Sequence, residues 1–297
     1  ASRNLEVEVI GLFDDRDEVR SPQAVHAHKK MGTITDLATY ARNHRVDLII
    51  VAIPLSAEAR LLHILKRLWE LPVDVRISGK ASSLKFSSTA YTYVGRLPLL
   101  AMFDRPLMGW GLFLKNVFDR AIASVALVVL APVMLAVAIA IRLESKGPVL
   151  FKQKRYGFNN ELIEVFKFRS MYANRCDAHA TTLVSKGDPR VTRVGRLIRK
   201  TSLDELPQLF NVLTGQLSLV GPRPHATQAK AADTLYEQVV DGYFARHRVR
   251  PGITGWAQIN GWRGETDTRE KIEQRVKHDL DYIDHWSLMF DVKILAC

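Results

Sequence analysis

The stretch that decides the architecture of this chain is AIASVALVVLAPVMLAVAIAI, residues 121–141. This apolar run of roughly 21 residues is about as long as a straight helix that crosses the hydrocarbon core of a bilayer. Pro132 stands at its middle, where the missing N–H and the ring predict a kink. Basic residues flank both ends, and this disfavours placing those ends on opposite sides of a membrane. We therefore expect a re-entrant helix, with a true span and a buried core helix as the alternatives.

The chain is expected to divide around this run. Residues 1–105 alternate strand-like and helix-like segments, with strands over 7–13, 46–53 and 73–77 and helices from 35 and from a cap at Ser56. This alternation predicts an α/β domain with a parallel sheet. Residues 106–148 are expected to be a linker and the membrane helix. Residues 149–297 hold most of the polar motifs and are expected to form a catalytic domain.

The composition indicates a folded protein with anionic partners. Of its 297 residues 47% are hydrophobic and 25% charged, and the net charge is +11. We expect phosphorylated substrates or lipid headgroups rather than nucleic acid, because no aromatic and basic pattern of a nucleic-acid motif occurs. Cys176 and Cys297 form no CxxC pair, which favours a reducing compartment. The first residue is Ala and the last residues are apolar, so we expect a fragment of a longer chain.

Two adjacent acids, Asp204 and Glu205, are the strongest candidates for chemistry. One interpretation is a capping box with Ser202 as the N-cap and Glu205 three residues later. The other starts the helix at Asp204, so that Pro207 falls in its first turn and Gly215 ends it. Both place the acids at a helix N-terminus, where the dipole favours the ionised form. An ionised Asp can attack phosphorus, and an ionised Glu can bind Mg²⁺.

Three cationic motifs surround these acids in the sequence. Alternation along 166–171 puts Lys167 and Arg169 on one strand face, as a clamp for a diphosphate or as part of a plain edge strand. Arg223 lies between two prolines, which fits a phosphate grip or a rigid turn. Arg250 lies in the glycine-rich segment 249–261, whose glycines allow a ligand to approach the backbone, with a plain turn-strand-turn as the alternative.

The motifs resemble one family when they are taken in order. They are Lys115-x-x-Phe118-Asp119, the proline-broken run, Lys167-Phe168-Arg169-Ser170-Met171, Ser202-Leu203-Asp204-Glu205-Leu206-Pro207-Gln208, Leu219-Val220-Gly221-Pro222-Arg223-Pro224 and Val249-Arg250-Pro251-Gly252-Ile253-Thr254-Gly255-Trp256. From about residue 112 onward the chain is similar to the bacterial sugar transferases, also called monotopic phosphoglycosyl transferases. Residues 1–105 resemble the Rossmann-like domain that precedes the catalytic domain in larger members. Asn116 departs from the family pattern, since many relatives have Arg there.

The resemblance implies a fold and a reaction. The fold is an α/β Rossmann-like domain followed by a mainly α, α+β monotopic membrane domain with a re-entrant helix. The reaction transfers a sugar 1-phosphate from a UDP-sugar to undecaprenyl phosphate and releases UMP. Asp204 matches the family nucleophile, which forms a covalent phosphosugar intermediate, and Glu205 matches the acid associated with Mg²⁺. The remaining substrate-binding residues that the resemblance implies are Lys167, Arg169, Arg223, Arg250 and Asp279, the last completing the acidic end.

The same resemblance places the protein at the cytoplasmic face of a bacterial inner membrane, in contact with lipid, as the first enzyme of exopolysaccharide, capsule or other surface glycan assembly. Glucose is the favoured sugar, and the oligomeric state, a homo-oligomer included, stays open. Two alternative functions are also open: an Mg²⁺-dependent nucleotide-sugar hydrolase or phosphatase, and a non-catalytic scaffold of a polysaccharide machine.

Overall fold

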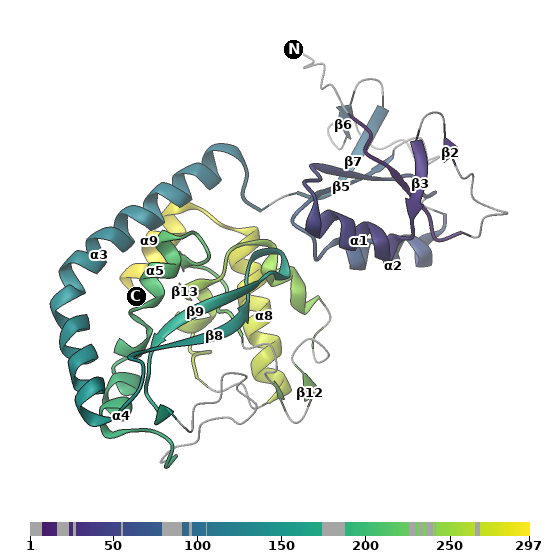
Figure 1. Ribbon diagram of the computed structural model, residues 1–297. Coiled ribbons are helices and arrows are strands. Elements are labelled where there is room, and N and C mark those ends of the chain that lie inside the picture. Colours follow the sequence, from purple (N-terminus) through teal and green to yellow (C-terminus); the bar gives the residue numbers. More distant parts are fainter. Residues whose placement is uncertain are drawn as a thin grey trace. The chain divides into compact units, whose positions relative to one another are not determined.

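The chain forms two compact units, Ala1–Arg105 and Pro106–Cys297, which we describe separately (Figure 1). The computed structural model describes residues 8–16, 24–25, 28–54, 56–78, 91–94, 97–104, 106–173, 188–225, 230–231, 234–235, 240, 242–264 and 268–297. Cys176 lies outside these residues, and Cys297 is free and exposed.

The first unit is an α/β structure with two sheets. Its elements are β1 (Leu12–Phe13), β2 (Ala24–Val25), β3 (His28–Gly32), α1 (Ile34–Asn43), β4 (Leu48–Val51), α2 (Glu58–Leu68), β5 (Asp74–Ser78), β6 (Tyr91–Val94) and β7 (Leu97–Phe103). The main sheet has the order β4-β5-β7-β6, and β1, β3 and β2 form a second sheet. β4 and β5 are parallel, as predicted, but β7 is antiparallel to both β5 and β6. The expected parallel pairing is therefore confirmed for β4 and β5, whereas β6 and β7, which the strand–helix alternation did not include, extend the sheet in antiparallel orientation.

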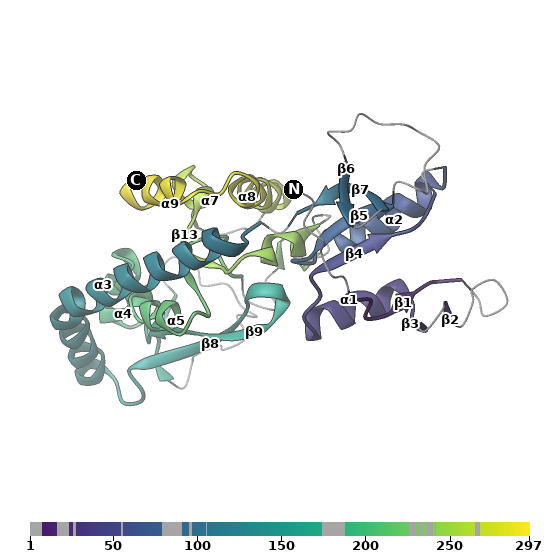
Figure 2. The ribbon, with the colours of Figure 1, turned by 90° about the horizontal axis from the view of Figure 1, so that it is seen from above.

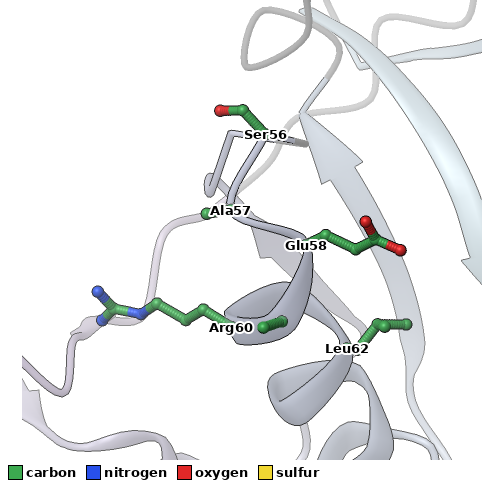
Figure 3. A pocket seen from close by; sticks show the side chains of 6 residues that line it. Ser56, Ala57, Glu58, Arg60 and Leu62 are labelled. Atoms are coloured by element: carbon green, nitrogen blue, oxygen red, sulfur yellow. The ribbon is translucent and has the colours of Figure 1, made fainter.

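Apolar periodicity accounts for the core of this unit. Ile64 and Leu68 of α2 are each 1% exposed, and Val75 of β5 is fully buried. The predicted N-cap at Ser56 is wrong, since Ala57 occupies that position without a side-chain hydrogen bond. A shallow hollow at the start of α2 is lined by residues 56–60 and Leu62 (Figure 3), and it contains none of the predicted site residues.

The second unit begins with α3 (Gly109–Glu144), which contains the apolar run. Among the described residues it is the one helix long and apolar enough to cross a membrane, and only 11% of its most apolar window is buried. Val128 is 76% exposed, and Leu135 is 63% exposed. Figures 1 and 2 show that α3 is bent. Pro132 lies inside it and has no N–H for the helical hydrogen-bond ladder, which is a usual cause of a bend.

The rest of the second unit mixes short strands and helices. Its elements are β8 (Leu150–Tyr156), η3 (Phe158–Asn160), β9 (Leu162–Phe168), α4 (Arg193–Lys200), η5 (Leu203–Glu205), α5 (Gln208–Leu213), β10 (Ser218–Val220), β11 (Lys230–Ala231), β12 (Thr234–Leu235), η6 (Tyr243–Arg248), β13 (Gly252–Thr254), α7 (Trp256–Ile259), α8 (Arg269–Asp284) and α9 (Leu288–Ala296). β8 and β9 form a long antiparallel hairpin, and β10 pairs with β13 in parallel.

Both ends of α3 are attached to this same unit. Near the start, the buried Lys115 ammonium lies 3.0 Å from Asp119 and 2.8 Å from Asp291 and donates to the carbonyl oxygen of Val220. Near the end, Val137 and Ile141 pack in an apolar cluster with residues of β9 and α4. The apolar helix is therefore held near both of its ends by one folded body.

Candidate active site

The two acids lie in a 3₁₀ turn, η5, between α4 and α5. Ser202, which precedes the turn, has a left-handed backbone (φ 59°) and caps nothing with its side chain. Its hydroxyl instead accepts a hydrogen bond of 2.6 Å from Arg263. Both predicted helix starts are thus wrong. Helix α5 begins at Gln208, with Pro207 as its N-cap, because the left-handed Ser202 and the 3₁₀ turn after it separate α5 from α4. The predicted stop at Gly215 is confirmed by its φ of 79° just beyond α5.

Glu205 is held by two cations. The Nζ of Lys167 donates to its Oε1 at 2.9 Å, and Arg223 contacts both carboxylate oxygens, with Nη1 at 3.2 Å from Oε2. Burial opposes ionisation, but the Arg223 and Lys167 cations outweigh it and hold the pKa of Glu205 well below its usual range. Glu205 is therefore a fixed anion at neutral pH.

Asp204, its neighbour, differs in environment. Burial raises the pKa of Asp204 above its ordinary value, and the adjacent Glu205 adds to this, while Lys167 opposes it. Among the described residues none donates a hydrogen bond to its carboxylate, so the oxygen lone pairs face no competing donor there. A carboxylate with this environment is a better nucleophile than one that is already engaged.

Arg155 of β8 is a site residue that the sequence did not reveal. Its Nη1 donates to the carbonyl oxygen of Pro224 at 2.5 Å, and its Nη2 donates to Gln153 at 2.8 Å. Burial lowers the pKa of Arg155 to about 10, and Arg223 contributes to this shift. Burial also lowers the pKa of Lys167 to about 8, with Arg155 as the next cause. Lys167, Arg223 and Arg155 thus lie around the two acids. Arg155 could have been predicted only from the pairing of β8 with β9.

A buried amide aligns the strand of Lys167 with the turn of the acids. Asn211 of α5 is fully buried. Its Oδ1 accepts from the backbone N–H of Phe166 at 2.9 Å, and its Nδ2 donates to the carbonyl oxygen of Glu164 at 2.7 Å. These two groups belong to the edge of β9 that does not face β8, so the side chain acts as the peptide group of a further strand. No local pattern around Asn211 predicts this contact.

The loop of Arg223 is fixed by close backbone pairing of the two proline-glycine motifs. Gly221 donates to the carbonyl oxygen of Thr254 at 3.0 Å, and Gly252 donates to that of Pro222 at 2.9 Å. A Cβ on Gly221 would lie 2.5 Å from the carbonyl oxygen of Arg250, so only glycine fits there. The carbonyl oxygen of Arg223 also accepts from Arg246 at 2.7 Å.

Three predicted substrate-binding residues pair with groups other than the two acids. Arg169 is buried against the C-terminal end of α3, where it donates to the carbonyl oxygens of Ser145 and Lys146. Arg250 donates to Asn116 of α3. Asp279, expected to complete the acidic end, is buried and pairs with Arg246 at 2.5 Å. Substrate contacts of these three residues stay predictions.

The donor set decides whether a Mg²⁺ ion fits here. Within the described part of the chain, no three His, Cys, Asp or Glu side chains gather closely enough to hold a metal. Mg²⁺ usually needs only one or two carboxylates when substrate phosphates and water supply the other oxygens. Asp204 and Glu205 supply that number, so the residues fit an ion that arrives with a diphosphate rather than a resident one.

Comparison with known proteins adds a family to this geometry. Residues 110–297 match the family model described as bacterial sugar transferase, and residues 1–79 match that of a CoA-binding domain.

Three relatives show the range of similarity. The chain is 43% identical over 97% of its length to an undecaprenyl-phosphate glucose phosphotransferase of Komagataeibacter xylinus, of which it covers 52%. It is 41% identical over 97% of its length to the UDP-glucose:undecaprenyl-phosphate glucose-1-phosphate transferase of Escherichia coli K12, of which it covers 60%. It is 46% identical over 62% of its length to a UDP-N-acetylgalactosamine-undecaprenyl-phosphate N-acetylgalactosaminephosphotransferase of Aeromonas hydrophila, of which it covers 42%. The chain thus spans about half of the length of these curated relatives.

Proposed function

The chain belongs to the bacterial sugar transferase family, and we propose that it transfers a sugar 1-phosphate from a UDP-sugar to undecaprenyl phosphate and releases UMP. The observation that carries this proposal is the arrangement around Asp204. One carboxylate, to which none of the described residues donates a hydrogen bond, lies next to a second one that Lys167 and Arg223 keep ionised.

The reaction takes two displacements at phosphorus. An oxygen of Asp204 attacks the phosphorus that bears the sugar, an Asp–phosphorus bond forms, and the bond to UMP breaks as UMP takes the electron pair. A phosphate oxygen of the lipid then attacks the same phosphorus and releases the Asp204 carboxylate. Splitting the transfer in this way lets one site serve a soluble donor and a lipid acceptor in turn.

The surrounding cations lower the cost of bringing anions together. Lys167, Arg155 and Arg223 are half-buried around the acids, where their charges act through a lower dielectric than in water. They favour a diphosphate and the charge that develops on UMP as it leaves. We propose that Glu205, with Asp204 and the diphosphate, also holds Mg²⁺, which would neutralise further phosphate charge.

The attachment of α3 supports a re-entrant position in the membrane. A spanning helix places its two ends about 30 Å apart on opposite faces of the hydrocarbon core. Here Lys115 near one end and Glu144 at the other both contact the same unit. We therefore propose that α3 dips into the cytoplasmic leaflet of the inner membrane and keeps the acids at the depth of the lipid phosphate.

We propose glucose as the sugar and the first step of surface polysaccharide assembly as the role. The support is that two relatives, matched over 97% of the chain, are named for glucose transfer. The relative named for N-acetylgalactosamine matches a smaller share of the chain. None of the site residues described above distinguishes the two sugars by its chemistry.

The test is UMP release by the full-length protein in vesicles, from UDP-glucose and from UDP-N-acetylgalactosamine, with and without undecaprenyl phosphate. We expect lipid-dependent release from UDP-glucose that Asp204→Asn abolishes. Asp284→Asn, which removes an exposed carboxylate on α8, should leave release unchanged.

Other outcomes separate the rival functions. Sustained release of many UMP per enzyme without the lipid acceptor would support a nucleotide-sugar hydrolase, because the first displacement alone releases at most one UMP per enzyme. A folded protein that releases no UMP from either donor would support the scaffold instead.

A further inference from the structure

The C-terminal end of α3 is closed by a buried guanidinium. Arg169 is 3% exposed. Its Nη2 donates to the carbonyl oxygen of Ser145 at 2.8 Å, and its Nη1 donates to that of Lys146 at 2.9 Å. Gly147 follows with a φ of 122°, and a Cβ there would lie 2.2 Å from Nη1 of Arg169. The carbonyl groups of the C-cap residue of α3 and of the residue after it are thus bound by one side chain, which follows β9 directly.

The last residue of α3 in turn binds the start of the next helix. Glu144 accepts from the backbone N–H of Arg193 at 2.6 Å through Oε1 and from that of Val194 at 2.9 Å through Oε2. Thr192 caps the same helix by accepting from Gly195 at 2.9 Å. A carboxylate is favoured at this position because the helix N-terminus carries positive partial charge.

Helix α4 leads from this contact to the acids. It runs from Arg193 to Lys200, and after Ser202 the chain enters the turn of Asp204 and Glu205. Ile198 of α4 packs in one apolar cluster with Ile141 of α3.

Helix α4 also lies against the segment that follows β9. The carbonyl oxygen of Ser170 accepts from Thr192 at 3.1 Å, and a Cβ on Gly195 would lie 2.0 Å from that oxygen. Little freedom therefore remains between the end of α3 and the catalytic turn.

We propose that Arg169 and Glu144 are positioning residues, which join the apolar helix α3 to α4 and thereby set the position of Asp204. Arg169 binds the carbonyl groups of Ser145 and Lys146, directly after α3, and Glu144 binds the first amide groups of α4. On this assignment Arg169 serves the position of the nucleophile, whereas Lys167, two residues earlier, pairs with Glu205 in the site. The expected effect of this positioning on kcat rests on the function proposed above.

The test compares Glu144→Ala, Glu144→Gln and Glu161→Ala in the full-length protein in vesicles. Glu161 is exposed and offers a matched control for loss of a glutamate. We expect Glu144→Ala to lower kcat for UMP release about tenfold or more, because a small displacement of a reacting group is costly. The KM for UDP-glucose should stay within about twofold, since the contacts of Lys167 and Arg223 with Glu205 are untouched. Glu144→Gln should recover part of kcat because its amide oxygen still accepts one N–H.

Hydrogen exchange gives a readout that does not depend on activity. In Glu144→Ala we expect faster exchange of the amides of 193–194 and also of 203–206. Faster exchange that stays at 193–194, or an unchanged kcat, would overturn the proposal and leave Glu144 as a local cap. If the wild-type protein releases no UMP, the proposed function fails, but the spread of exchange to 203–206 still decides the positioning claim.

Discussion

The two units of this chain bury different kinds of side chain. In the described part of the first unit the buried side chains are apolar, as in Ile64 and Val75. The second unit also buries charged groups, among them Lys115, Arg246 and Asp291. Apolar burial is non-directional, whereas a buried ion pair is favourable only at defined distances and angles. The buried ion pairs of the second unit therefore fix the positions of particular atoms, which the apolar core of the first unit does not do.

The largest expected effect is the loss of the anion between the two cations of the site. Glu205→Gln leaves Lys167 and Arg223 without their shared partner, so kcat for UMP release should fall at least about 100-fold. Glu70→Gln is the matched control in the first unit, where Glu70 pairs with Arg42 at 3.5 Å. It should leave kcat unchanged. A Glu205→Gln enzyme with near wild-type kcat would contradict the role of the pair.

The next effect concerns stability. Lys115→Met leaves Asp119 and Asp291 buried without their cation, and it should lower the free energy of unfolding of the second unit by about 3–5 kcal/mol. Ile64→Val in the first unit should cost about 0.5–1.5 kcal/mol. Hydrogen exchange of the protein in detergent measures the stability of each unit separately, from the peptides that belong to that unit. Equal losses of unfolding free energy in the two variants would contradict the distinction between directional and non-directional burial.

A smaller effect is expected at the amide that binds the edge of β9. Asn211→Asp keeps an acceptor for Phe166 but turns an oxygen towards the carbonyl group of Glu164, which loses its donor. The free energy of unfolding should fall by about 1–3 kcal/mol. Asn43→Asp, at the exposed end of α1, should change it by about 0.5 kcal/mol or less. Thermal unfolding of both variants measures the difference.

The smallest effect is a pH dependence confined to the second unit. Because the pKa of Lys167 is lowered to about 8, kcat/KM should decline several-fold as the pH rises through about 8 and the ammonium is lost. The free energy of unfolding should instead rise as the pH rises through this range. The unfolded chain binds the lysine proton up to its ordinary value of 10.5, so stability rises between the two values. In the Lys167→Arg variant, both the decline of kcat/KM and the rise in the free energy of unfolding should disappear from this pH range.

Periodicity predicted the fold where burial follows a simple rule. The helix with Leu61 and Leu68 and the strand around Val75 were predicted because their apolar residues recur at helical or alternating spacing. The antiparallel addition of β7 was not, since strand pairing depends on partners that are distant in sequence. The left-handed backbone at Ser202 also escaped prediction, because a residue other than glycine rarely adopts it.

The candidate site was predicted in part for the same reason. The structure brings Asp204, Glu205, Lys167 and Arg223 together, as their motifs indicated. Arg169 has the same strand alternation as Lys167, but β9 ends at Phe168 and the chain turns away there. Arg155 and Asn211 carry no local pattern, since their importance arises only from the pairing of β8 with β9 and of β9 with α5.

One consequence of α3 concerns the shape of the membrane. A bent helix that is held at both ends by one unit, in the proposed re-entrant position, adds its volume to a single leaflet. The lipids of that leaflet must spread to admit it, whereas the opposite leaflet is unchanged. The helix is then a wedge, which enters most easily where the leaflet is already stretched on a convex surface. The protein should accordingly gather on small vesicles and impose curvature on flat ones.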